Sequence, residues 1–495
     1  MSLPWVVVTD PFESQDILLR RTKDFDRARY FGDVISGVLP EQHIQFQSHD
    51  PRFKNNRALI NHLMAPTFVS QVSAPEVYKS VCTLMKLWQA KCGLAEGRPW
   101  SPHGDITFWA LDSIFASSFG LLEADSNTVR RLEAVQRAGA PALPDNADEP
   151  VAFPEGDIPD IFRAALTLSD SLTQTQLSPA PRLTAWLMHK LPYLRRATAK
   201  KDAWLGARID EAVALIEADI DSDRPHSALH SVLLRERDTA VREGRAPAYH
   251  KRAIADEFLG FMMAGHDTTA TTVVWGVKLL TDHSVVQTRL REELRAALPD
   301  AAKGQRAPAY DELMRANIPY LDAVVNEILR KANTIDFAVR VALRDTTVLG
   351  HHIPRGTDVF LMANGAGYLA PALPVDDSLR SPGARRGEAN VKGLTGSWDD
   401  SDAAEFQPER WLRTDPANGA ESFDPLAGPT LAFGLGPRGC FGRRLALQSL
   451  RIIFAMIVWH FELRPTPAEL SGYDAVQRFA REPTQCFVSL ETAVI

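Results

Sequence analysis

The chain has 495 residues, of which 45% are apolar and 24% charged, and its formal net charge is -7. This is the composition of a soluble globular protein, and the charge argues against a general nucleic-acid binder, because phosphate binding needs a basic surface. The four cysteines, Cys82, Cys92, Cys440 and Cys486, are too few and too scattered for a disulfide framework or a Cys-x-x-Cys zinc site.

The first residues, MSLPWVVVTDPFE, contain an apolar run that is too short for a secretory signal. The longest apolar run, Ile452 to Trp459, is far shorter than the roughly 20 residues that cross a bilayer. We therefore expect no membrane anchor within this chain.

The first half is predicted to be mostly helical, interrupted by a proline-rich acidic surface loop at residues 140–159. A second irregular stretch, residues 371–403, is rich in Gly, Pro, Asp and Arg, and we expect a mobile insertion there. Neither stretch has an independent core on both sides. The prediction is one domain, residues 1–495, mainly α with a minor β component.

A long helix is predicted over residues 255–280, with an acid beside a hydroxyl, Asp267 and Thr268, at its middle. Four threonines within six residues lower the helix propensity of this segment, so the run indicates that the threonines have a functional role. Ordinary bonding of threonine hydroxyls to the preceding turn is an equally good explanation from the residues alone.

After this helix come Glu327 and Arg330, whose i, i+3 spacing by itself predicts only an ion pair on one helix face. Two β-prone runs, 346–349 and 358–362, are predicted to pair as a hairpin. Another short strand is expected in TQCFVSLE near the C-terminus.

The loop FGLGPRGCFG, residues 433–442, directly precedes a helix that is apolar on nearly every face and is therefore predicted to be buried. Cys440 lies just before the N-terminus of that helix, where free N–H groups and the helix dipole are expected to lower a thiol pKa. The glycines leave room for a flat bulky group. A thiolate ligand to haem iron suits this setting, and the alternative is an inert buried cysteine in a glycine-rich turn.

This loop resembles the haem-ligand signature of the cytochrome P450 superfamily, the haem-thiolate monooxygenases. The resemblance implies the cytochrome P450 fold and a haem (heme b, iron protoporphyrin IX) whose iron is bound by the Cys440 thiolate. It also implies that Phe433, Gly434 and Gly442 contact the haem, and that Arg438 binds a propionate.

The segment AGHDTT is similar to the oxygen-activation motif of the same superfamily. The resemblance makes Thr268 the hydroxyl that steadies bound dioxygen and Asp267 its partner in proton delivery. Ala264 and Gly265 are expected to leave room for oxygen and substrate.

Four further arginines and one glutamate take roles from the resemblance. Glu327 and Arg330 look like the family's structural pair, which joins Arg410 of FQPERW in a buried charge cluster. Arg340 and Arg57 are expected to bind haem propionates, although Phe53 stands where the family has tryptophan.

The resemblance implies a monooxygenase that inserts one atom of O2 into an apolar small molecule, with electrons supplied from NADPH by a reductase. Arg438, Arg443 and Arg444 are a candidate basic patch for that partner. The alternatives are a haem protein without oxygenase turnover, such as a sensor or pseudoenzyme, and a reductase-independent isomerase or dehydratase. The intact Asp267-Thr268 pair argues against both.

The sequence as a whole resembles fungal members of the superfamily that oxidise secondary metabolites. The family implies association with the endoplasmic reticulum membrane. Residues 6–27 look like a strand-helix unit that normally lies well inside such proteins, so the anchor and first strands are expected to be missing through a truncated gene model or, alternatively, in a short variant.

Overall fold

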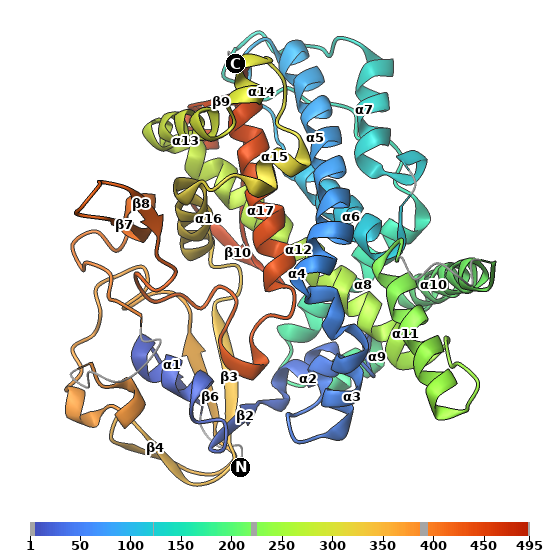
Figure 1. The fold of residues 1–495 in the computed structure, drawn as a ribbon, viewed down its shortest axis with the longest axis vertical. Helices are drawn as coiled ribbons and strands as arrows, with labels where there is room; N and C mark the ends of the chain where they lie inside the picture. Colours follow the sequence, from blue (N-terminus) through green and yellow to red (C-terminus); the bar gives the residue numbers. More distant parts are fainter. Residues whose placement is uncertain (1–4, 122, 219–224, 387–394, 494–495) are drawn as a thin grey trace.

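The computed structural model describes residues 5–121, 123–218, 225–386 and 395–493, and its helices form most of the molecule (Figure 1). The helices are α1 Pro11–Leu19, α2 Arg29–Ile35, α3 Pro51–Ile60, α4 Pro66–Phe68, α5 Ala74–Ala95, α6 His103–Phe119, α7 Asn127–Ala138, α8 Asp160–Gln176, α9 Pro181–Met188, α10 Pro192–Ala218, α11 Ala228–Glu243, α12 Arg252–Asp282, α13 Ser284–Ala297, α14 Pro299–Lys303, α15 Tyr310–Arg315, α16 Pro319–Ala332 and α17 Arg443–His460. Among the described helices, none is long and apolar enough to cross a bilayer.

The strands are short and form one larger sheet and several two-stranded ones. They are β1 Val6–Val8, β2 Phe25–Arg27, β3 Phe337–Ala342, β4 Thr346–Val348, β5 His351–Ile353, β6 Asp358–Met362, β7 Leu412–Thr414, β8 Glu421–Phe423, β9 Phe461–Arg464, β10 Ala475–Gln477, β11 Arg481–Pro483 and β12 Ser489–Thr492. The larger sheet has the order β1-β6-β3-β2, in which β1 runs parallel to β6 and the other pairs are antiparallel. The mainly α fold with a minor β component is confirmed.

The predicted pairing of residues 346–349 with 358–362 is wrong. Thr346–Val348 pairs instead with His351–Ile353 across Leu349 and Gly350, both of which have positive φ. Such a two-residue turn closes a hairpin at once. Strand β6 therefore joins the larger sheet between β1 and β3.

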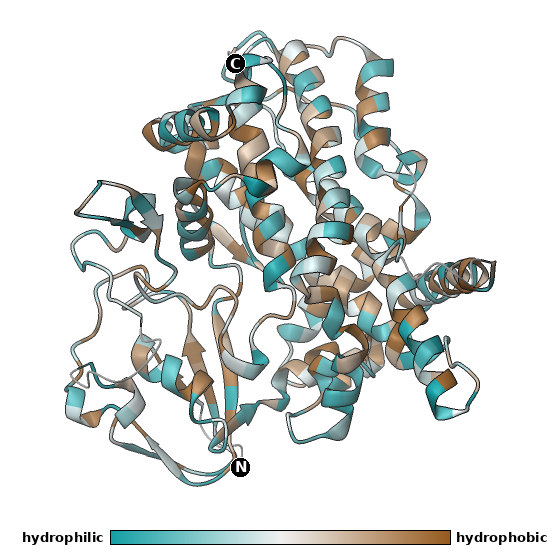
Figure 2. Ribbon diagram, in the orientation of Figure 1, coloured by the Kyte–Doolittle hydropathy of each residue, from teal (hydrophilic) through white to brown (hydrophobic). Residues whose placement is uncertain are grey.

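The helical core surrounds α17, which lies against α5, α12 and α16 (Figure 1). Residues 452–459 of α17 are at most 1% exposed, as the apolar run predicts. Hydrophobic and hydrophilic turns alternate along α5 and α7, the pattern of helices that bury one face (Figure 2). The core thus holds α17 and the loop before it in a fixed place.

Part of the irregular stretch 371–403 is anchored on α1. The Arg380 guanidinium lies 2.6 Å from the Asp10 carboxylate, and Ser381 donates hydrogen bonds to Glu13 and Asp16. Residues 387–394 lie outside the described residues. The mobility expected of the whole insertion stays a prediction, and the contacts described attach Arg380 and Ser381 to α1.

Candidate functional site

The loop before α17 is folded by its own backbone and by α1. The Cys440 N–H donates to the Phe433 carbonyl at 2.7 Å, which closes the loop around the cysteine. Gly434 and Gly436 have φ of +57° and +69°, a region that side chains disfavour. A Cβ on Gly436 would also lie 2.2 Å from the Leu18 carbonyl oxygen, so only glycine fits there.

The Cys440 side chain is exposed, yet it sits deep enough that burial raises the pKa of its thiol. Cys440 is thus accessible, although protein atoms surround much of its thiol. N–H groups of Gly442 and Arg443 and the charges of Arg443 and Arg57 oppose the rise but do not outweigh it. The expectation of a lowered pKa was wrong, because the helix N-terminus is weaker than the loss of solvent. A metal cation at the sulfur would reverse this balance, since a coordinating thiol is deprotonated.

Helix α12 runs beside the cysteine loop, and one side of the helix there is accessible to solvent. The ring of Phe261 on α12 lies 6.4 Å from the ring of Phe441, the residue after Cys440. One turn on, Ala264 is exposed although Met262 and Met263 beside it are buried. The described structure thus brings an accessible stretch of α12 close to the cysteine loop.

Thr268 lies on this accessible stretch. Its hydroxyl donates to the Ala264 carbonyl at 2.7 Å, the bond to the preceding turn that threonines commonly make in helices. The hydroxyl oxygen keeps its lone pairs as acceptors. In the described part of the chain, no hydrogen bond joins Thr268 to Asp267.

Gly265 lies where helix α6 packs closely against α12. A Cβ there would lie 2.9 Å from the Cδ1 of Ile114 on α6. Its small size therefore permits close packing of α6 on α12, and Ala264 is the residue of this pair that faces the accessible space.

Asp267 turns toward α8 and β11 and is half-buried. Burial, together with the negative charges of Glu482 and Asp170, raises the pKa of its carboxyl to about 7, while Arg478 and His103 oppose the rise. A carboxyl with this pKa both holds and releases a proton near neutral pH.

Three arginines gather beside the cysteine loop with too little negative charge to match them. Arg27 on β2 is opposite Arg340 on β3 in the sheet, although like charges facing each other destabilise a strand pair. Arg438 lies close enough for its charge to lower the pKa of Arg27, and Asp26 is the acid that counters them. Burial, helped by neighbouring arginines, brings the pKa of Arg438 to about 10.

Hydrogen-bond donors in this cluster lack acceptors. The Nη1 of Arg438 and the Nε of Arg27 are buried without a hydrogen-bond partner in the described structure. Because buried donors are normally paired, the cluster fits an anion, and two haem propionates would supply the missing charge. Arg27 was missed from the sequence, since only its pairing opposite Arg340 reveals it.

Arg57 on α3 contacts the cysteine loop from outside. Its Nη1 donates to the Pro437 carbonyl at 2.7 Å. Phe53 packs between the two arginines: the Arg438 guanidinium lies 3.8 Å and the Arg57 guanidinium 5.7 Å from its ring centre. Phe53 thus supports Arg438, and Arg57 holds the loop.

Glu327, Arg330 and Arg410 are brought together in the core. Two bonds of 2.6 and 2.8 Å join Arg330 to the Glu327 carboxylate, and Arg410 lies 3.3 Å from it. Trp411 and the Gln407 N–H also donate to this carboxylate, each at 2.9 Å. The Arg410 Nε has no hydrogen bond in the described structure, but its 3.3 Å ion pair with Glu327 keeps its charge balanced. Such a charge-paired cluster is expected to hold the core and to take no part in chemistry.

Comparison with known proteins agrees with this geometry. The family model described as Cytochrome P450 matches residues 1–368 and 398–476. The chain is 36% identical to the cytochrome P450 monooxygenase TRI13 of Fusarium sporotrichioides, over 98% of this chain and 85% of that protein. It is 31% identical to the cytochrome P450 monooxygenase xilC of Penicillium rubens, over 99% and 83%. The crystal structure of the cytochrome P450DA heme domain is similar in fold, with a TM-score of 0.68 at 17% identity, covering 99% of this chain and 88% of that one.

Proposed function

This chain belongs to the cytochrome P450 family, and from this premise we propose that it inserts one oxygen atom of O2 into a largely apolar small molecule. It is an oxidoreductase of the haem monooxygenase class, as its relatives are. The single observation that carries the proposal is the accessible Cys440 sulfur close to the accessible stretch of α12.

The residues take the following roles in this proposal. Cys440 holds the iron, and Arg27, Arg340 and Arg438 bind the propionates. Bound haem supplies the oxygen and electron chemistry. The Thr268 hydroxyl accepts a hydrogen bond at the oxygen site.

Proton supply is assigned to Asp267, whose carboxyl has a pKa of about 7. A group with a pKa near the working pH is the most effective proton donor. The electrons are proposed to come from NADPH through a reductase, because no residue of the site supplies them.

The substrate is proposed to be a secondary metabolite. Relatives at 31 to 36% identity are monooxygenases of fungi. The stretch of α12 beside the cysteine loop carries the apolar residues Phe261, which is half-buried, and Ala264, which is exposed. Apolar walls favour a substrate with little charge.

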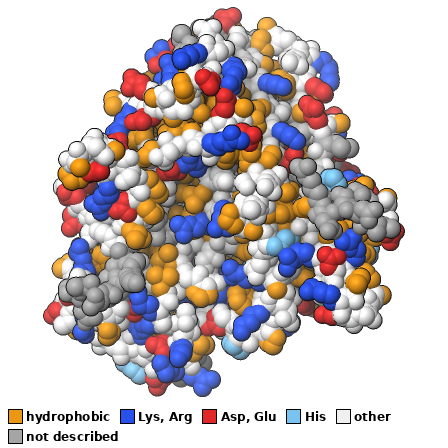
Figure 3. Space-filling view, viewed as in Figure 1, with side chains coloured by type: hydrophobic (Ala, Val, Ile, Leu, Met, Phe, Trp, Pro, Cys, Tyr) orange, Lys and Arg blue, Asp and Glu red, His pale blue; other side chains and the backbone are white. Residues whose placement is uncertain are grey.

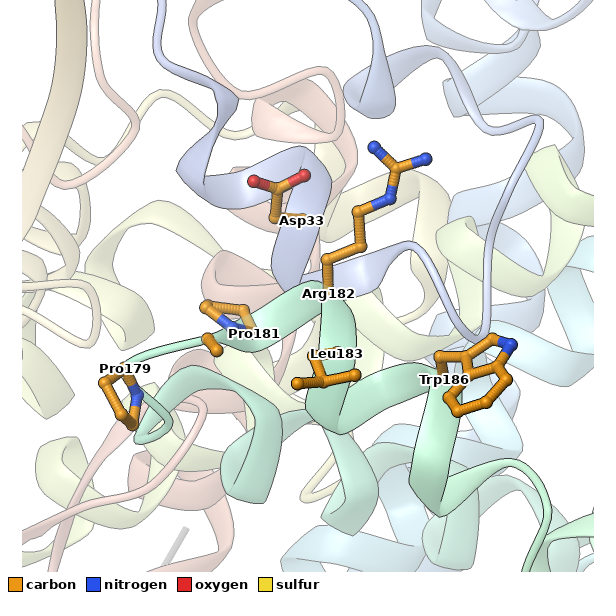
Figure 4. A pocket seen from close by; sticks show the side chains of 7 residues that line it. Asp33, Pro179, Pro181, Arg182, Leu183 and Trp186 are labelled. Atoms are coloured by element: carbon orange, nitrogen blue, oxygen red, sulfur yellow. The ribbon is translucent and has the colours of Figure 1, made fainter.

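Membrane association is supported by an apolar surface around α9. Figure 4 shows Leu183 and Trp186 projecting from α9, with Arg182 near Asp33 of α2. The Lys190 ammonium lies 3.9 Å from the Trp186 ring centre. A mixture of basic and large apolar side chains is typical of helices that lie in a membrane interface. The exposed apolar residues are Leu177, Leu183, Trp186, Leu187, Leu191 and Tyr193.

The double variant Trp186→Ser, Leu187→Ser is expected to bind vesicles of anionic phospholipid more weakly than the parent in a sedimentation assay. The control is Val285→Ser, which removes an exposed apolar side chain on α13. Equal binding by all three proteins would argue against this surface.

The decisive test of function is the carbon monoxide spectrum. The haem-loaded, reduced protein is expected to show the red-shifted Soret band of a sulfur-ligated iron, and Cys440→Ala should lose it. Oxygen uptake with NADPH and a reductase then separates a monooxygenase from a haem sensor or an isomerase. A normal spectrum without oxygen uptake for any apolar substrate would leave only those alternatives.

A further inference from the structure

The hairpin of β10 and β11 is fixed against α12 near Asp267. The Trp275 Nε1 of α12 donates to the Arg481 carbonyl at 3.0 Å, and the Arg481 guanidinium lies 5.0 Å from the same ring. The Arg481 N–H also donates to Thr334 at 2.9 Å. These contacts hold the next residue, Glu482, at a defined place beside the helix.

Glu482 acts on Asp267 through its charge and lies beside groups that reach solvent. Its carboxylate lies 3.7 Å from the His103 Nε2 and 3.9 Å from the Arg478 Nε. Glu482 is 8% exposed, whereas the His103 side chain is 45% exposed at the start of α6. The charged groups that act on Asp267 are Glu482 of β11, Asp170 of α8, Arg478 of the hairpin turn and His103 of α6.

We propose that Glu482 and His103 carry protons from solvent to Asp267. This inference rests on the proposed function, whose balance is RH + O2 + 2 H⁺ + 2 e⁻ giving ROH + H2O. Both protons come from solvent, and both electrons from the NADPH-dependent reductase. The route runs from the exposed His103 ring to the buried Glu482 and from there to the half-buried Asp267.

The electrostatics agree with this direction of transfer. Burial first, and then the charges of Glu482 and Asp170, raise the pKa of Asp267 to about 7. Asp267 donates only while protonated, so the share of electrons that reaches product should fall as pH rises through about 7. Removing the Glu482 charge should lower the pKa of Asp267, and this fall should move to lower pH by about one unit.

The experiment compares Glu482→Gln with Glu482→Asp and with the control Glu469→Gln, which removes an exposed carboxylate on the same C-terminal segment. Glu482→Gln should lower product formation about tenfold, raise the solvent isotope effect and shift the pH profile as described. Glu482→Asp should restore much of the rate, and Glu469→Gln should match the parent.

His103→Gln tests the outer end of the route without touching the core, and it should raise the solvent isotope effect in the same way. A second measurement does not depend on turnover: infrared titration of the protonated Asp267 carboxyl, identified by its loss in Asp267→Asn. Its midpoint should fall in Glu482→Gln.

The inference is overturned if Asp267→Asn impairs product formation while Glu482→Gln and His103→Gln leave the pH profile, the isotope effect and the infrared midpoint unchanged. Failure of the proposed function is a different result. In that case Asp267→Asn has no effect on oxygen use, or the sulfur-ligated spectrum is absent.

Discussion

Two threonines on α12 make the same hydrogen bond in different surroundings. The Thr268 hydroxyl donates to Ala264 at 2.7 Å, and the Thr272 hydroxyl donates to Thr268 at 2.8 Å. Thr272 is only 3% exposed, whereas Thr268 lies on the accessible stretch. The hydrogen bond to the preceding turn is therefore the same in both threonines, and only the exposure of Thr268 makes it a candidate for a role at the site.

Thr268→Ala is expected to uncouple the reaction, because the oxygen site loses its hydroxyl. Product per electron should fall about tenfold and peroxide release should rise. The readouts are peroxide and product per NADPH consumed. Thr272→Ala removes the same helix bond and should stay coupled, and Thr268→Ser should keep most of the parent coupling. If the two alanine variants behave alike, Thr268 has no special role.

The arginine cluster predicts opposite effects on the haem-free and haem-loaded protein. Arg27→Gln removes one of three neighbouring positive charges, so the haem-free protein should not lose thermal stability. The loaded protein should release haem about tenfold faster, because one propionate partner is gone. The measurements are melting curves of both forms and haem transfer to a scavenger. Arg29→Gln, an exposed neighbour, is the control, and equal haem release by both variants would contradict the role of Arg27.

At the scale of the elements, the junction of α11 and α12 depends on one buried carboxylate. Glu236 accepts hydrogen bonds from Arg245 at 2.7 Å, the Ala248 N–H at 2.9 Å and Lys251 at 3.1 Å. Burial alone would raise the pKa of Glu236, but these donors outweigh it and lower the pKa to about 2. The ionised Glu236 carboxylate thus stabilises this junction in the folded state.

Glu236→Gln should lower the free energy of unfolding by up to about 3 kcal/mol at neutral pH. Since the folded pKa is depressed, this stabilisation is present above about pH 4.5 and is lost as pH falls toward 2. Urea unfolding at pH 7 and at pH 4 measures it, and the difference between parent and variant should shrink at the lower pH. Glu243→Gln removes an exposed partner of the same Arg245 and should cost less than about 1 kcal/mol. A constant difference across pH would contradict the assignment.

At the scale of the whole molecule, charge is unevenly distributed. On the face shown in Figure 3, separate Lys and Arg side chains lie in the middle among hydrophobic and other atoms, and Asp and Glu lie chiefly toward the rim. Arg443 and Arg444 at the start of α17 are exposed. A basic centre of this kind favours an acidic partner.

The double variant Arg443→Glu, Arg444→Glu should slow turnover driven by the reductase about tenfold. Turnover driven by peroxide should fall much less, and any such fall reflects the charge of Arg443 beside Cys440. The slowing should weaken as ionic strength rises, because salt screens surface charge. Steady-state rates with each oxidant measure this. Equal losses in both assays would show that the arginines act on the site itself.

The sequence by itself determined the family and the elements that carry it. The glycines around Cys440 predict the cysteine loop, and the apolar residues of α17 predict a buried helix. The AGHDTT segment resembles the family's oxygen-activation motif, and all three are local patterns. Such patterns can be recognised without the tertiary structure because they depend only on residues that are neighbours along the chain.

Only the tertiary structure decided the surroundings of these residues. Arg27 and Arg340 are far apart in sequence and meet only in the sheet, and Asp267 gains Glu482 only because the β10–β11 hairpin packs on α12. The pKa of Cys440 likewise depends on how far the fold excludes water. Desolvation and charge pairing arise between distant segments, so no window of sequence contains them.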